Sequence, residues 1–138
     1  MDTKQKLEHL LRTLFQHSGK TMNPASEQSI NNFQNKALDK GVPSSVIDEL
    51  TTFYRISNGI PCLNGFDFHS CDDEILFEWW SKQELWLAQC DFYTLRWAND
   101  KYCIGDAADV SFSSKDEYLS LISLIENAMK EWGLDVQH

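Results

Sequence analysis

The chain has 138 residues, a formal net charge of −9 and 42% hydrophobic residues. A chain of this length forms one domain and buries about 68% of the surface that its unfolded form exposes. It begins without the basic start and apolar run of a signal peptide, and no apolar segment approaches the ~20 residues that span a membrane. These features exclude a membrane protein and predict one cytoplasmic domain over residues 1–138.

The charge is divided unevenly between the two halves of the chain. Residues 1–60 hold seven Lys or Arg against six Asp or Glu, and residues 61–138 hold five against fifteen, so the halves carry +1 and −10. A negative field of this size repels nucleic acid and anionic membranes and attracts basic proteins. The simpler interpretation is that the acidic residues only keep the domain soluble. The composition favours a basic protein as partner, with no nucleic acid and no membrane.

Cysteine usage indicates neither a disulfide scaffold nor a metal site. The four cysteines are sparse for a chain that can build a core, so we expect reduced thiols. His69 lies two residues before Cys71, but no Cys-x-x-Cys pair is present and the other histidines are far away in sequence. We therefore expect no metal and no cofactor.

The first 60 residues predict three short helices. Apolar residues recur at helical spacing from Thr3 to Gln16, which predicts the first helix. Asn23 followed by Pro24 has the pattern of a helix start, so the second helix is predicted from there to Gly41. Its expected buried stripe comprises Ile30, Phe33, Ala37 and Leu38.

A third helix is predicted between a proline and a glycine. Pro43 has its φ already set for a first helical turn, and Asn58-Gly59 is a stop signal, so the helix should end near Ser57. Its predicted buried stripe comprises Val46, Leu50, Phe53 and Tyr54.

After Ile60 the pattern changes to short β-type runs, which predict a small, mostly antiparallel sheet. The expected strands are Phe66–Phe68, Phe92–Trp97, Tyr102–Ile104 and Val110–Phe112. Residues 72–89 are ambiguous, and we expect a strand first and a helical turn after it.

The chain closes with a helical stripe that should pack on the sheet. This helix is predicted to start after a Ser113–Ser114 cap and to end at Gly133. Its stripe comprises Tyr118, Leu121, Ile122, Ile125, Met129 and Trp132. Helices, then strands, then a helix make an α+β fold, a sheet flanked by helices in a single domain.

Catalytic motifs are absent from the sequence. There is no Gly-x-Ser-x-Gly, no phosphate-binding glycine loop and no His-Glu-x-x-His. In the run from His69 to Glu74, a cysteine near a histidine suggests an activated thiol, but the neighbouring acids would raise the thiol pKa and disfavour the thiolate. We expect no enzymatic activity.

The acidic second half also contains clustered tryptophans, which together resemble a protein-binding surface. If residues 74–80 form a strand, Trp79 and Trp80 cannot both point inward, so one should lie near the surface. The acids at 72–74 have the alternative role of capping a new element. The candidate partner-binding residues are Asp67, Asp72, Asp73, Glu74, Glu78, Trp79, Trp80, Glu84 and Asp91.

Several short motifs, in this order, resemble the SUKH superfamily. They are the helix from Ala25 to Phe33, the segment from Val42-Pro43 to Phe53-Tyr54, Ser57-Asn58-Gly59, Phe66-Asp67-Phe68, Ile104-Gly105-Asp106-Ala107 and the helix that begins Tyr118-Leu119-Ser120-Leu121. The resemblance covers most of residues 25–132, within a family-like region 23–132 that follows the first helix and its connector, residues 1–22. The chain departs from the family at Val42, where leucine is commoner, and in its tryptophan-rich middle segment.

The resemblance implies an α+β domain without enzymatic activity. In most bacterial members of the superfamily this domain is an immunity protein that binds and neutralises a polymorphic toxin domain, often a nuclease. Other members are intracellular regulators or scaffolds. From the acidic composition we expect the cognate toxin domain to be basic.

Overall fold

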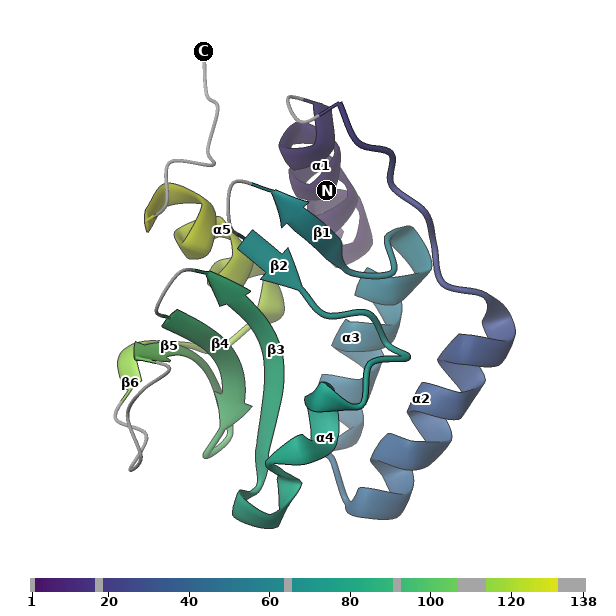
Figure 1. The fold of residues 1–138 in the computed structure, drawn as a ribbon, viewed down its shortest axis with the longest axis vertical. Coiled ribbons are helices and arrows are strands. Elements are labelled where there is room, and N and C mark those ends of the chain that lie inside the picture. The colour runs from purple at the N-terminus through teal and green to yellow at the C-terminus, as the bar shows by residue number, and fades with distance from the viewer. Residues whose placement is uncertain (1, 17–18, 64–65, 91–92, 107–113, 132–138) are drawn as a thin grey trace.

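The computed structural model of the chain describes residues 2–16, 19–63, 66–90, 93–106 and 114–131. These form one compact α+β domain, as the sequence predicts, with a helical first part and a sheet that follows it (Figure 1). The helices are α1 (Thr3–Gln16), α2 (Glu27–Lys40), α3 (Ser44–Ile56), α4 (Ile75–Glu78), the 3-10 helix η1 (Trp80–Lys82) and α5 (Leu121–Glu131). The strands are β1 (Ile60–Leu63), β2 (Phe66–Phe68), β3 (Glu84–Cys90), β4 (Tyr93–Ala98), β5 (Lys101–Asp106) and β6 (Ser114–Tyr118).

The six strands form one sheet in chain order, and each pairs antiparallel with the next. The described sheet is therefore antiparallel throughout. Strand β1 was not predicted from the sequence, because its four residues include Pro61. A proline has no N–H to donate to a neighbouring strand, so it is found on edge strands. Strand β1 lies at the edge of the sheet and can therefore contain Pro61.

The core lies between one face of the sheet and the helices. Figure 1 shows α3 between α2 and the sheet, and the Phe53 ring of α3 lies 4.3 Å from the Phe68 ring of β2. Helix α1 contacts α3 and α5, and α5 contacts β5 and β6, so the predicted packing of the last helix on the sheet is confirmed. The largest fully buried side chains come from both layers: Tyr54, Tyr102, Phe53, Phe66, Phe68 and Leu7.

Helices α1 and α3 confirm the predicted ranges, and the start of α2 does not. The cap of α2 is Ser26, whose side-chain oxygen accepts a hydrogen bond of 3.1 Å from the Ser29 N–H. Asn23 and Pro24 instead lie in the preceding connector. Leu38 is 61% exposed, so its predicted burial is wrong. Its neighbour Ala37 takes the core-facing position at that level of the helix.

The prediction for residues 72–89 is wrong, because the helical turns come first and the strand follows. Glu74 is the N-cap of α4, and the preceding residue Asp73 accepts a hydrogen bond of 3.1 Å from the Ile75 N–H at the start of this helix. Gln83 then adopts a left-handed conformation with φ 59°, which ends η1. The chain continues as β3, where Leu85 and Leu87 are buried in the core.

The last helix starts later than predicted. Residues Ser114–Tyr118 form strand β6, and Ser120 caps α5 by accepting a hydrogen bond of 3.2 Å from the Ser123 N–H. Tyr118 is therefore a strand residue. The predicted strand Val110–Phe112, and the expected end of the helix at residues 132–133, lie outside the described residues.

Candidate functional site

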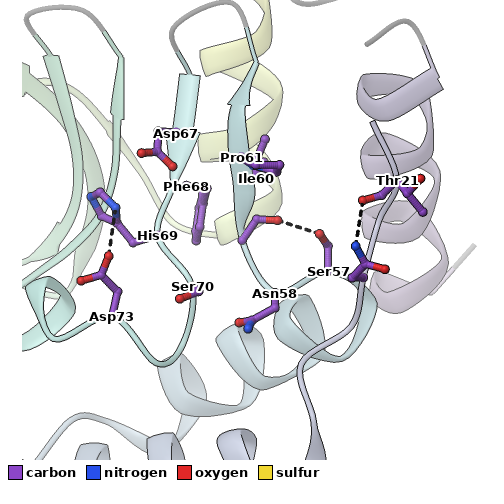
Figure 2. A pocket seen from close by; sticks show the side chains of 12 residues that line it. Thr21, Ser57, Asn58, Ile60, Pro61, Asp67, Phe68, His69, Ser70 and Asp73 are labelled. Carbon is purple, nitrogen blue, oxygen red and sulfur yellow. Dashed lines mark hydrogen bonds and ion pairs between the residues drawn. The ribbon is translucent and has the colours of Figure 1, made fainter. Parts of the chain in front are cut away.

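A polar pocket of about 450 Å³ opens where the end of α3 meets strands β1 and β2 (Figure 2). Its walls come from the connector before α2, the turn after α3, strand β1, and the segment from β2 to the start of α4. The lining residues are Thr21, Asn23, Ser57, Asn58, Gly59, Ile60, Pro61, Asp67, Phe68, His69, Ser70 and Asp73.

The turn after α3 is built by the Ser57-Asn58-Gly59 motif. The buried Ser57 leaves the helix in an extended conformation, and its hydroxyl donates a 2.6 Å hydrogen bond to the Gly59 carbonyl. Gly59 has φ +92°, and a Cβ built there would lie 2.4 Å from the Phe68 carbonyl oxygen. Only glycine fits so close to β2 at this φ. The motif therefore ends α3 and also forms one wall of the pocket.

Asn58 connects three segments around the pocket. Its backbone N–H donates to the Asn23 carbonyl at 2.7 Å, and its side-chain oxygen accepts a 2.9 Å hydrogen bond from the Cys71 N–H. Its side-chain amide also donates to an Asp72 carboxylate oxygen at 3.3 Å. The sequence interpretation used Asn58 only as a helix stop, and its role as a connector depends on segments that are distant in sequence.

Two aspartates and a histidine are the ionisable side chains that line the pocket. Asp67 lies in β2, and His69 is the first residue after this strand. The His69 Nδ1 lies 3.9 Å from an Asp73 carboxylate oxygen (Figure 2). The His69 side chain is 10% exposed, whereas that of Asp73 is 47% exposed. The backbone of His69 is held by the Tyr54 hydroxyl, which donates to the His69 carbonyl at 2.9 Å.

Burial keeps the groups beneath the pocket neutral. Desolvation raises the pKa of the Tyr54 hydroxyl well above its ordinary value, and the nearby Cys71, Asp73 and Asp72 raise it further. Burial, and after it the Asp72 carboxylate, raises the pKa of the Cys71 thiol to about 11. The sequence predicted this direction from the neighbouring acids, and burial is the larger cause. A thiol with this pKa is protonated at neutral pH and a poor nucleophile.

The structure separates the predicted partner-binding residues into groups. Asp67 and Asp73 line the pocket. Asp72 does not line it, but its carboxylate accepts a hydrogen bond from Asn58, which does. Glu74 and Glu78, at the start and end of α4, are exposed. We call Asp67, Asp72, Asp73, Glu74 and Glu78 the acidic edge. Among the described residues, Asp73 pairs with His69, and the other four acids of this edge form no ion pair.

Trp79 and Trp80 are both partly buried, and they lie against different partners. The Trp80 ring stacks on Trp97 at 6.4 Å, and its indole N–H donates to the Lys40 carbonyl at 2.7 Å. The Trp79 ring stacks on Trp86 at 4.9 Å. These contacts give both tryptophans a structural role, and their contact with a partner stays a prediction.

Glu84 also has a structural role that the sequence did not indicate. Its carboxylate lies 2.8 Å from Arg96, whose side chain is 3% exposed, and the Trp86 indole N–H donates to it at 3.1 Å. The Arg96 guanidinium also lies 4.2 Å from the Trp86 ring. The structure thus places Glu84, Trp79 and Trp86 in one cluster around a buried arginine. Asp91 lies outside the described residues.

No group of three or more His, Cys, Asp or Glu among the described residues is placed to hold a metal ion. In the same part of the chain, every helix is too short or too polar to cross a membrane. Comparisons of the chain with protein-family models, with curated proteins and with solved structures found no match. The resemblance to the SUKH superfamily therefore depends on the sequence motifs alone.

Proposed function

We propose that this chain is a cytoplasmic immunity protein of the SUKH type, which binds a basic toxin domain and neutralises it by occlusion. The observation that carries the proposal is the acidic edge beside the polar pocket. Asp72, Glu74 and Glu78 are exposed, and none of them forms an ion pair with a residue that the structure describes. Their negative charge is therefore available to a basic partner.

Two further observations support binding without catalysis. The cysteine beside the pocket is buried and has a raised pKa, so it lacks the thiolate character of a catalytic nucleophile. The order of the elements, with helices first and a sheet covered by a final helix, agrees with the fold that the SUKH resemblance implies. The Ser57-Asn58-Gly59 motif on which that resemblance partly depends forms a wall of the pocket.

The alternative is a regulatory or scaffold domain of the same fold, which would bind a basic partner other than a toxin. The neighbouring gene distinguishes the two. A long secreted protein encoded immediately upstream, with a basic C-terminal domain, favours immunity. An unrelated operon favours regulation.

The test measures protection and binding with that C-terminal domain as the probe. Cells that express it should grow when this chain is co-expressed, and the purified proteins should associate at a rate that falls as salt rises, because charge steers the encounter. The test variant replaces Asp72, Glu74 and Glu78 by lysine and leaves Asp73 in place, because Asp73 accepts the hydrogen bond of the Ile75 N–H at the start of α4. The matched control replaces Asp39, Asp48 and Glu126, which are equally exposed, and changes the net charge by the same amount.

We expect the edge variant to associate several-fold more slowly and to protect less, with a melting temperature within a few degrees of the parent, because it loses only the exposed Asn58–Asp72 hydrogen bond. The control variant should retain most of the association rate, because its charges lie on α2, α3 and α5 and belong neither to the acidic edge nor to the pocket lining. Equal loss in both variants would show that only net charge matters. A rate that does not respond to salt, or full protection by the edge variant, would contradict the proposal.

A further inference from the structure

We propose that the polar pocket binds the guanidinium group of an arginine side chain from the partner. This inference depends on the proposed function and specifies the partner residue that the pocket would hold. The pocket is lined by two aspartates, and the lining residues that the structure describes include no lysine or arginine. Its volume of about 450 Å³ falls within the usual range for small-ligand pockets, about 300–1,000 Å³. One long side chain and some water would fill it.

His69 adds a polar side chain to the pocket wall. Its side chain is 10% exposed, and its imidazole makes no hydrogen bond to a described residue, but its nitrogens are not fully buried and stay open to the pocket. The nearest ionic group is Asp73, and the 3.9 Å between them is longer than a hydrogen bond of about 2.7–3.2 Å. A neutral imidazole has one nitrogen that accepts a hydrogen bond, so His69 can add an acceptor to the pocket.

The two aspartates also keep accepting capacity. One Asp73 carboxylate oxygen accepts from the Ile75 N–H at 3.1 Å, and the other is the one that faces His69. The Asp67 backbone belongs to the β2–β3 ladder, and its carboxylate forms no ion pair within the described part of the chain. Asp67 is half-buried and Asp73 is exposed at the pocket opening, so both carboxylates can accept charge-assisted hydrogen bonds from a cationic donor that enters the pocket.

The arrangement fits a guanidinium better than a metal ion or an ammonium group. The described residues include no group of His, Cys, Asp or Glu placed to hold a metal ion. Asp67 and Asp73 come from different segments, β2 and the turn before α4, so a ligand must reach both. A planar guanidinium offers five N–H donors in a fixed fork, whereas an ammonium group is a compact point charge.

Among the described residues, Lys20 brings its ammonium group to the rim of the pocket. The Lys20 ammonium donates to the carbonyl of Pro61, a residue that lines the pocket, at 3.1 Å. This hydrogen bond shows that a rim carbonyl of the pocket accepts from a cationic group.

The test is an NMR titration of the isotope-labelled chain with Nα-acetyl-arginine methylamide. The matched probe is the citrulline analogue, which has nearly the same shape without the charge. We expect saturable shifts of the backbone amides of Asn58, Asp67, His69 and Asp73 with the arginine probe, and no saturation with the citrulline probe. Asp67→Asn and Asp73→Asn should each weaken binding about five- to tenfold. Asn at position 73 retains an oxygen for the Ile75 N–H.

Asp48→Asn is the control variant, because Asp48 is exposed on α3, its side chain is not among the pocket residues, and the charge change is the same. It should bind the arginine probe as the parent does. Equal binding of both probes, shifts spread over the acidic surface, or saturable binding of Zn²⁺ at His69 in place of the arginine probe would overturn the inference. If the pocket ignores the arginine probe while the toxin domain still binds through the acidic edge, the inference fails and the proposed function stands.

Discussion

The side-chain oxygen of Asn58 accepts a hydrogen bond of 2.9 Å from the backbone N–H of Cys71. This bond joins the turn after α3 to the turn after β2, which are the two sides of the polar pocket. Because the Cys71 residue is buried, its N–H has little access to water and depends on this acceptor.

Asn58→Ala should therefore destabilise the protein by about 1–3 kcal/mol, since it leaves a buried donor without its partner. Chemical denaturation in urea would measure the change. Asn31→Ala, at an exposed position of α2, is the control and should leave the free energy of unfolding unchanged or slightly higher, because alanine is the better helix former. Equal effects of the two substitutions would show that the Asn58 contact contributes nothing.

The sequence predicted elements well where local signals agreed. Helix α3 has a proline at its start, one apolar stripe and a polar stop, and all three indicate the same boundaries. For helix α2 the Asn23-Pro24 pattern gave the wrong start, because the apolar periodicity does not fix the first turn and Ser26 supplies the cap. In residues 72–89 the apolar residues fit either period, and long-range contacts decide the outcome. One such contact joins Trp80 to the Lys40 carbonyl, 40 positions away.

The candidate site could be predicted only in part. The acidic residues and the Ser57-Asn58-Gly59 motif are visible in the sequence, and both belong to the site. That they meet Thr21 and Asn23 depends on how α3 folds back against the connector, which no local pattern records. Glu84 was assigned to the partner-binding surface because acids and tryptophans cluster in that part of the sequence. Its buried partner Arg96 lies on the neighbouring strand, at a register that the sequence does not fix.

Glu84→Ala should reduce stability strongly, because it removes the carboxylate that faces the buried Arg96. Removing one partner of a buried ion pair costs about 3–5 kcal/mol. Glu78→Ala, at an exposed position of α4, should change the free energy of unfolding by less than about 0.5 kcal/mol. Denaturation of both variants would separate the two acids. A stable Glu84 variant with weakened partner binding would restore Glu84 to the binding surface.

The pKa of the Cys71 thiol predicts a loss of stability in alkaline solution. Its pKa is raised from 9.0 to about 11 by burial and by Asp72, so between these values the unfolded chain releases a proton that the folded chain keeps. The contribution of this thiol is fully present below pH 9 and is lost as the pH rises toward 11, with a slope of at most about 1.4 kcal/mol per pH unit. Cys71→Ala should reduce that slope, whatever its effect at neutral pH. An unchanged slope in the variant would mean that the thiol titrates alike in both states.

Two glycines with nearly the same φ separate backbone strain from close packing. Gly41 has φ +88° and open space where a Cβ would lie, whereas Gly59 has φ +92° and a Cβ there would meet the Phe68 carbonyl oxygen at 2.4 Å. Gly41→Ala should cost about 1–2 kcal/mol, the strain of a left-handed conformation alone. Gly59→Ala adds a contact that only a shift of the turn or of β2 can relieve, so it should cost more and also move the NMR signals of Ser70 and His69 at the pocket. Urea denaturation would give the loss of unfolding free energy in both variants, and NMR spectra would show whether the pocket signals move. Equal losses with unchanged pocket signals would show that the turn relaxes freely and that the close approach of Gly59 to β2 does not shape the pocket.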